Sequence, residues 1–336
     1  MHSDRLPGNF TPFDVPLPAS AAEWEARKGE LRRTLRELLG ETPPLFTPQP
    51  RIVERQAGEG YTRERIEFDN GAGATVYGFL LVPTGRTQPG PAILYHHYHG
   101  GHYDLGKDEC LQPNALGEPK GPALARAGYV VLSIDAYAFG DRQHQGPAGE
   151  REKGGQTELS LFKQFLWQGR TLWGMMVRDD TLALNYLLSR PEVDPARVGA
   201  MGMSMGSTRS WWLAALDERI KATVAVACLT RYQNLLRHGD VFEHGIYYFV
   251  PGILARGIDM EALIGCIAPR ALLTLTGAVD GGSPVDGVEQ INAFLRQVYA
   301  RYGADDRFEG VVYPGEGHVF NADMWRRMQA WFARQL

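Results

Sequence analysis

The sequence predicts an α/β fold built on one mixed, mostly parallel β-sheet, and three observations carry this prediction. Three strand-like segments come first and are separated by Gly-Glu-Gly and Asn-Gly turns, which are typical of antiparallel hairpins. Short apolar runs then alternate with helical stretches, as parallel strands do when helices cover both faces of a sheet. The chain has 336 residues, of which 44% are hydrophobic, enough to bury one large core. We therefore expect a single domain over residues 1–336.

The expected elements follow from apolar runs and helical periodicity. The antiparallel strands are expected at 51–57, 61–68 and 74–83, and the parallel strands at 92–95, 129–134, 198–201, 222–227, 271–275 and 310–313. Helices are expected between them, at 120–127, 171–189, 205–217, 287–302 and 321–335.

An N-terminal arm, residues 1–50, precedes the sheet. Its segment 20–39 reads as an amphipathic helix that begins with a Ser20/Glu23 capping box. Gly40 and two prolines after it end the helix. We expect the apolar face of this helix, which includes Trp24, to clamp onto the main body.

Composition excludes several classes of partner. The formal net charge is −4, so the chain lacks the basic field that binds nucleic acid or an anionic membrane surface. No uninterrupted apolar run reaches the ~18 residues of a membrane span. The N-terminus shows no secretory signal, and we expect a cytoplasmic protein. The three cysteines have no paired spacing and are expected to be structural thiols.

The motif that carries chemistry is Gly-Met-Ser-Met-Gly at 202–206. It follows an apolar strand and precedes a helix, the setting in which a serine sits on a sharp turn with its hydroxyl exposed. Flanking glycines are needed because side chains there would collide with neighbouring backbone. The pattern predicts that Ser204 is a nucleophile.

A serine nucleophile needs a base and an acid that orients the base. Asp280 follows the strand at 271–275, and His318 follows the strand at 310–313. This is the chain order Ser, Asp, His that such turns accompany, and both residues lie at the strand ends where ligands bind. Asp286 is a rival acid, although its place near the start of a helix suits an N-cap.

The oxyanion hole is expected from two backbone N–H groups. One belongs to Met205, the residue after the nucleophile, and the other to the loop after the strand at 92–95. Gly100 and Gly101 allow that loop to turn back, so the second donor is Tyr98 or His99. The loop also holds several histidines, but too few further ligands lie nearby for a metal site, and we expect neither metal nor cofactor.

An insertion of about forty residues, 229–268, separates two parallel strands and is long for an α/β connection. It is expected to form a lid or pocket wall above the nucleophile. Its aromatic stretch suggests His244, Tyr247 and Tyr248 as substrate-binding residues, with Trp211 of the helix after Ser204 as a further wall. The alternative is that these rings form only the small core of the lid.

Asp180 lies on the same helical face as Met176, Leu184 and Leu187. A carboxylate on an apolar face must be buried and paired. Arg142 is the partner we expect.

Together these segments resemble a known family. The motifs are YHHYHGG, DAYAFGDR at 135–142, the helix at 178–194, GMSMGS, GAVD and GEGH. From about residue 50 to 336 the chain resembles the dienelactone-hydrolase-like and acetyl-xylan-esterase-like serine esterases of the α/β-hydrolase fold. The resemblance implies the roles already given to Ser204, His318 and Asp280, with Met205 and the Tyr98–His99 segment at the oxyanion.

The chain departs from this family pattern in three places. Ser207 stands where a second glycine is usual, and the oxyanion loop is unusually rich in histidine. The nucleophile is a serine, whereas true dienelactone hydrolases use cysteine.

The sequence thus predicts a serine carboxylic-ester hydrolase that acts on a small-molecule ester through an acyl-enzyme. Two alternatives remain: a serine peptidase of the prolyl-oligopeptidase type, and a non-catalytic binding protein with a hydrolase fold. The sequence leaves homo-oligomerisation open.

Overall fold

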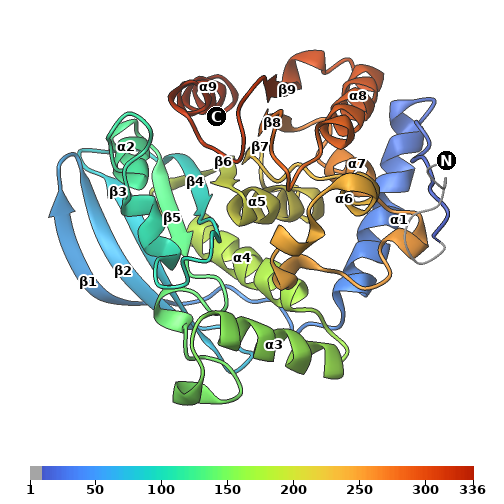
Figure 1. The fold of residues 1–336 in the computed structure, drawn as a ribbon. Helices are drawn as coiled ribbons and strands as arrows, with labels where there is room; N and C mark the ends of the chain where they lie inside the picture. Colours follow the sequence, from blue (N-terminus) through green and yellow to red (C-terminus); the bar gives the residue numbers. More distant parts are fainter. Residues whose placement is uncertain (1–9) are drawn as a thin grey trace.

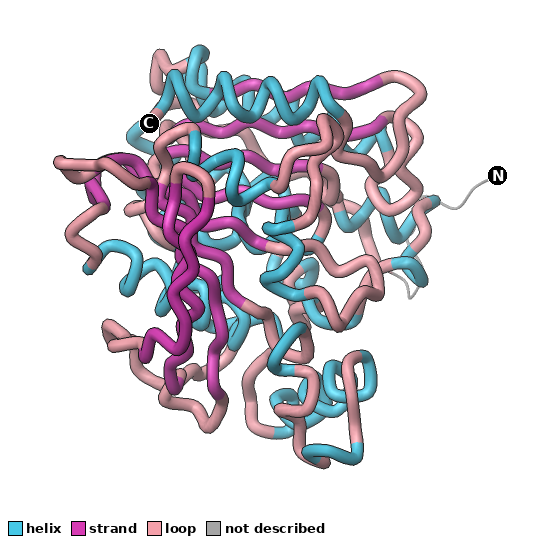
Figure 2. Tube along the Cα trace, turned by 90° about the vertical axis from the view of Figure 1, so that its left-hand side faces the viewer, coloured by secondary structure: helices cyan, strands magenta, loops and turns pink. Residues whose placement is uncertain are grey.

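The computed structural model describes residues 10–336 and contains one nine-stranded mixed sheet with helices on both faces (Figure 1; Figure 2, strands in magenta). The strand order is β1-β2-β3-β5-β4-β6-β7-β8-β9. The pairs β1–β2, β2–β3 and β3–β5 are antiparallel, and all later pairs are parallel. The predicted fold class is therefore confirmed, while residues 1–9 of the predicted arm lie outside the described residues.

Each of the nine strands overlaps an expected segment, although β6 begins at Val193, well before the expected start at 198. Their bounds are β1 Arg51–Gly58, β2 Tyr61–Asp69, β3 Thr75–Pro83, β4 Gly90–His96, β5 Val130–Ile134, β6 Val193–Met203, β7 Ala222–Val226, β8 Ala271–Gly277 and β9 Phe308–Tyr313. The helices are α1 Ala21–Leu39, α2 Lys120–Arg126, α3 Gly155–Trp167, α4 Leu172–Ser189, α5 Met205–Leu216, α6 Tyr232–His238, α7 Met260–Gly265, α8 Val285–Arg301 and α9 Ala322–Gln335. Three of these helices, α3, α6 and α7, were not expected from the sequence. Among residues 10–336 no helix has both the length and the apolarity needed to cross a bilayer.

Two apolar cores lie on opposite faces of the sheet. Neighbouring strand residues alternate between them, as Ile93 and Leu94 of β4 show. Helices α2 and α9 pack into one core, and α1, α3, α4, α5, α7 and α8 contribute to the other. Both faces are thus covered, which explains why the parallel strands read as continuous apolar runs.

Helix α1 packs against the C-terminal part of the domain, as the amphipathic pattern predicted. Ser20 caps it by accepting a bond from the Glu23 backbone N–H. The Trp24 ring is buried, and its Nε1 donates to the carbonyl oxygen of Gly265, 3.0 Å away. A side chain at Gly265 would meet the Trp24 ring at 2.6 Å, so the contact needs this glycine.

Two predictions about charged residues were wrong. Asp180 is buried, but it pairs with both Nε and Nη2 of Arg209 on α5, whereas Arg142 pairs with the neighbouring Asp179. Adjacent helical residues point about 100° apart, so the two aspartates face different elements. Asp286 is also not an N-cap: Pro284 holds that position, and Asp286 lies inside the first turn of α8.

Candidate active site

Ser204 lies at the sharp turn between β6 and α5. Its backbone φ is 57° and ψ is −122°, a left-handed conformation that costs free energy for a residue with a side chain. A Cβ at Gly202 or at Gly206 would lie 2.4 Å or 2.0 Å from the backbone oxygen of His96. The two glycines therefore let the turn pack against the end of β4, and Ser204 is raised above the sheet.

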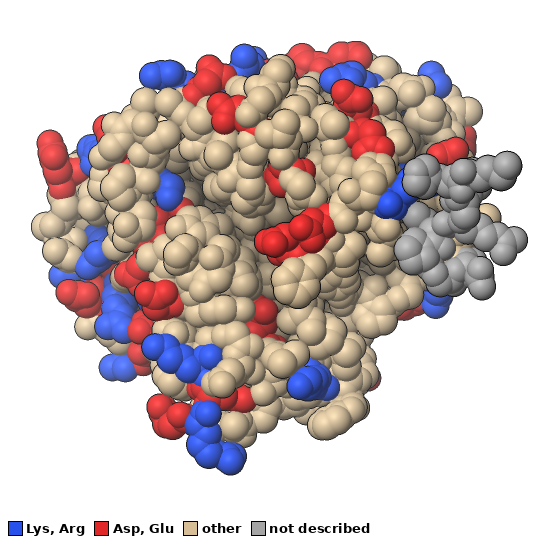
Figure 3. Space-filling view, viewed as in Figure 1, with Lys and Arg blue, Asp and Glu red and all other residues tan. Residues whose placement is uncertain are grey.

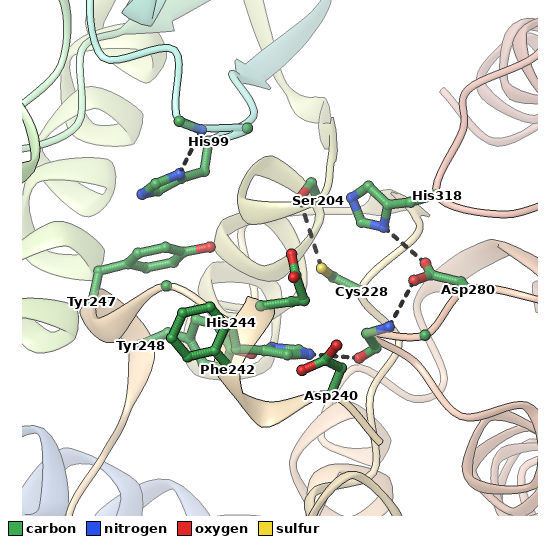
Figure 4. A pocket seen from close by; sticks show the side chains of 16 residues that line it. His99, Ser204, Cys228, Asp240, Phe242, His244, Tyr247, Tyr248, Asp280 and His318 are labelled. Carbon is green, nitrogen blue, oxygen red and sulfur yellow. Dashed lines mark hydrogen bonds and ion pairs between the residues drawn. The ribbon is translucent and has the colours of Figure 1, made fainter. Parts of the chain in front are cut away.

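His318 and Asp280 form a hydrogen-bonded pair in the loops that follow β9 and β8. The distance from His318 Nδ1 to Asp280 Oδ2 is 2.8 Å. The Asp280 side chain is buried and also accepts a bond from the Gly282 backbone N–H, whereas 41% of the His318 side chain is exposed. Because a carboxylate only accepts, the proton of the ring lies on Nδ1, and Nε2 is left as an acceptor. Figure 4 shows that the other edge of this ring faces Ser204.

All three residues line one cavity of about 650 Å³. The other lining residues come from the loop His99–Gly101, from Cys228 after β7, from the acid loop and from the insertion, as Figure 4 shows. The structure thus brings together the three side chains that the sequence proposed as nucleophile, acid and base.

Asp286, the rival acid, lies elsewhere. Its carboxylate accepts bonds from Asn234 Nδ2 at 2.8 Å, His238 Nε2 at 3.0 Å and the Gly287 backbone N–H at 2.9 Å. These partners keep Asp286 beside α6, and it does not contact His318.

The residues that were expected to supply the oxyanion hole differ in their positions relative to the cavity. Met205 is the first residue of α5, and the first N–H groups of a helix have no acceptor inside it. His99 lines the cavity, and within residues 10–336 its backbone N–H has no acceptor. Tyr98 is not among the lining residues; its ring packs near His102 and below the Lys120 ammonium. The Tyr98 backbone N–H likewise has no acceptor among residues 10–336, so the two candidate donors differ only in that His99 lines the cavity and Tyr98 does not.

The histidines of this loop serve separate partners. His96 Nδ1 pairs with Ser210 Oγ at 2.9 Å, and His97 Nε2 accepts from the Ala136 N–H at 3.0 Å. Burial lowers the pKa of His96 to about 3 and lowers the pKa of His97 as well, so both rings are neutral. His99 pairs through Nε2 with Glu158, a residue that the sequence analysis missed because α3 was not expected. In the described part of the chain, no three His, Cys, Asp or Glu residues are grouped to hold a metal ion.

The insertion supplies one wall of the cavity. It contributes Asp240, Phe242, Glu243, His244, Gly245, Tyr247 and Tyr248. His244 Nε2 donates to the carbonyl oxygen of Gly282 at 2.6 Å, which fastens this wall to the loop of Asp280. Burial lowers the pKa of His244, consistent with a neutral ring in that bond.

Trp211 lies outside the cavity. It is buried in α5 and faces a separate small space bounded by Thr208, Cys228 and Tyr248. The prediction that Trp211 forms a wall of the substrate cavity was therefore wrong.

Cys228 is a cavity residue that the sequence analysis treated as a structural thiol. Its Sγ lies 3.8 Å from Ser204 Oγ, and its backbone φ is 49°. Burial first, and the nearby Asp280 charge second, raise the pKa of this thiol to about 12. Its position directly after the strand beside β6 was the available signal, because neighbouring parallel strands end at the same edge.

The charge around the cavity is negative. Asp240 and Glu243 line it, and none of its lining residues within 10–336 is a lysine or arginine. Figure 3 shows acidic side chains at the margin of the hollow on this face. The electrostatic field at the mouth therefore disfavours anions.

Comparison with known proteins places this geometry in a family. Residues 121–249 match the dienelactone hydrolase family. The chain is 36% identical over 313 residues to YtaP of Bacillus subtilis strain 168, which is provisionally named a hydrolase; the match covers 90% of this chain and 99% of YtaP.

Solved structures of esterases share the fold. A protein of Bacteroides fragilis, provisionally named an acetyl xylan esterase, superposes with a TM-score of 0.70 at 20% identity, covering 88% of this chain and 76% of its own. A glucuronoyl esterase from Solibacter usitatus gives a TM-score of 0.68 at 17% identity, covering 98% and 96%. The strained serine turn, the sheet topology and the 36% identity lead to one assignment: the chain belongs to the dienelactone hydrolase family of the α/β-hydrolase superfamily and is a hydrolytic enzyme.

Proposed function

We propose that this protein is a serine carboxylic-ester hydrolase with a preference for short acyl groups, and that Ser204, His318 and Asp280 are its catalytic triad. The observation that carries the proposal is the His318–Asp280 hydrogen bond of 2.8 Å beside a cavity that also holds Ser204. That bond orients the ring with Nε2 free to act as a base.

The reaction follows from these positions. Nε2 of His318 takes the Ser204 proton while Oγ attacks the ester carbonyl carbon. The backbone N–H groups of Met205 and His99 stabilise the oxyanion of the tetrahedral intermediate. When the intermediate collapses, the C–O bond to the alcohol breaks and His318 returns the proton to the alcohol. Water then attacks the acyl-serine by the same route and releases the acid.

Two features support a small, uncharged substrate. Tyr247 and Tyr248 close one side of the cavity, which limits the length of the acyl group. The acidic lining and the lack of lysine or arginine among the described lining residues disfavour a carboxylate on the substrate. Three more distantly similar proteins carry the name carboxymethylenebutenolidase, which denotes a lactone that bears a carboxyl group. The acidic cavity of this chain suits a neutral ester better than such a lactone.

The test is a comparison of Ser204→Ala and His318→Ala with the unmodified enzyme. Because the triad acts as a unit, each variant is expected to lower kcat for p-nitrophenyl acetate by about 10⁴ to 10⁶. Ser204→Ala should also lose labelling by a fluorophosphonate while its circular dichroism spectrum is unchanged. A Ser204→Ala protein that keeps a tenth of the activity contradicts the proposal.

A further inference from the structure

The hydroxyl group of Tyr247 points into the cavity without a partner. The side chain is 4% exposed and lines the cavity with Ser204. Figure 4 shows the phenol directed toward the centre of the cavity, on the side of Ser204 and Cys228. Among the described residues no atom forms a hydrogen bond with this hydroxyl, although the aromatic ring that carries it is packed against its neighbours. A hydroxyl that faces a cavity without a protein partner is free to donate to a ligand.

The ring of Tyr247 is held rigidly. It stacks on the His99 imidazole with a centroid distance of 5.0 Å and an interplanar angle of 18°. Trp173 and Tyr248 contact it from other directions, at centroid distances of 5.7 Å and 5.1 Å. The direction of the hydroxyl is thus set by packing, which is what a preorganised donor requires.

His99 is itself fixed by hydrogen bonds. The Gly101 N–H donates to its Nδ1 at 3.0 Å, so the ring proton lies on Nε2, which donates to Glu158 at 3.0 Å. Glu158 also accepts from the Tyr103 hydroxyl at 3.2 Å. A continuous set of contacts therefore runs from α3 through His99 to Tyr247.

Tyr247 and the loop of His99 lie on the side of Ser204 opposite His318 (Figure 4). In serine hydrolases the base and the oxyanion donors lie on different sides of the attacked carbonyl. The Tyr247 hydroxyl therefore shares the side on which we place the oxyanion. Burial raises the pKa of Tyr247 well above its usual value, which keeps the phenol protonated and able to donate.

We infer that Tyr247 is a third oxyanion donor, which adds an O–H to the two backbone N–H groups, and that His99 and Glu158 are positioning residues for it. The inference rests on the proposed esterase function. It changes the expected role of Tyr247 from a wall, which needs only the ring, to a donor, which needs the hydroxyl.

Tyr247→Phe separates these two roles because phenylalanine keeps the ring. The variant is expected to lower kcat by about 100- to 1000-fold, the range for loss of one oxyanion donor, with little change in KM. The factor should be the same for p-nitrophenyl acetate and butyrate, since the wall is intact. Tyr302→Phe is the matched control, because that hydroxyl donates to Glu25 at the surface. A Tyr247→Phe enzyme with the same kcat as Tyr302→Phe overturns the inference.

A double-mutant cycle tests the positioning role. Glu158→Gln is expected to lower kcat in the unmodified enzyme but to have little further effect in Tyr247→Phe, because it acts through the hydroxyl that is already absent. A purely structural effect of Glu158 would be equal in both backgrounds and would refute the positioning role. Tyr103→Phe, which removes one bond to Glu158, gives a milder second variant if Glu158→Gln folds poorly.

Ser204→Ala in the same assay distinguishes a failure of the donor role of Tyr247 from a failure of the proposed esterase function. If Ser204→Ala is inactive and Tyr247→Phe is fully active, only the donor role of Tyr247 fails. If Ser204→Ala remains active, the esterase mechanism fails, and the role of Tyr247 fails with it.

Discussion

Oδ2 of Asp280 lies 2.8 Å from Nδ1 of His318, whereas Asp286, in the first turn of α8, accepts hydrogen bonds from its own helix and from α6. Two carboxylates close in sequence thus have different surroundings. Replacement of each aspartate by asparagine should therefore have different effects on activity.

Asp280→Asn is expected to lower kcat by about 10⁴, because an amide favours the wrong tautomer of the base. Asp286→Asn makes the same change of charge outside the cavity. Its kcat should stay within about twofold of that of the unmodified enzyme. The measurement is ester hydrolysis by both variants at one pH, after thermal unfolding has shown that they fold. Equal losses in the two variants would refute the assignment of Asp280.

Tyr248→Ala is expected to shift the preference toward longer acyl chains. Its ring is buried and lines the cavity, so truncation opens space beside the substrate. Each methylene that gains a contact is worth about 1–3 kcal/mol, which makes the shift visible in kcat/KM over an acetyl-to-octanoyl series. Trp167→Ala, at a ring that is 89% exposed, is the control. An unchanged chain-length profile would place the acyl group elsewhere.

Cys228 is expected to resist alkylation at neutral pH despite its place beside Ser204. The pKa of its thiol is raised from 9.0 to about 12, so the thiolate fraction near pH 7.5 is reduced roughly a thousandfold. Inactivation by iodoacetamide should therefore be slow and should accelerate as the pH rises toward 10. Mass spectrometry of the modified site and residual activity measure this together. Cys228→Ser should protect the activity, and rapid inactivation of the unmodified enzyme at pH 7.5 would contradict the shift.

Acid is expected to destabilise the fold through His96 and His97. Both rings are neutral when folded because burial lowers their pKa, that of His96 from 6.5 to about 3. The unfolded chain takes up protons at these rings below pH 6.5, so stability falls as the pH drops from about 6.5 toward 3. Two such groups give a slope of up to about 2.7 kcal/mol per pH unit.

Urea unfolding at pH 7.5, 6.0 and 5.0 measures this slope. His96→Gln should reduce the slope by about half, whereas His102→Gln, at an exposed position, should leave it unchanged. Identical slopes for His96→Gln and the unmodified protein would show that His96 is not buried in its neutral form.

The sequence was informative wherever the signal was local. The apolar runs of the strands and the glycines around Ser204 define elements within a few residues, and these predictions were confirmed. Helix α3 was missed because it starts after a glycine-rich stretch, with Gly154 at its N-cap instead of a capping side chain. Without α3, the Glu158 partner of His99 could not be expected.

Other errors concerned tertiary partners. Asp180 was correctly expected to be buried, but its partner depends on how α4 packs on α5, which no local pattern reveals. Trp211 belongs to a helix whose residues are buried on nearly every side. Such a helix has no amphipathic pattern, so the sequence could not tell which of its side chains faces the cavity.

The contact between Trp24 and Gly265 has a consequence for how the chain is made. The two residues are 241 positions apart, so α1 leaves the ribosome long before the segment it packs against. Until then the Trp24 ring lacks Gly265 and Phe294, the residues that it contacts in the folded chain. Exposed apolar helices of nascent chains are what chaperones bind. The Trp24 end of α1 can therefore dock only after α7 has been made, so this early segment reaches its native contacts late.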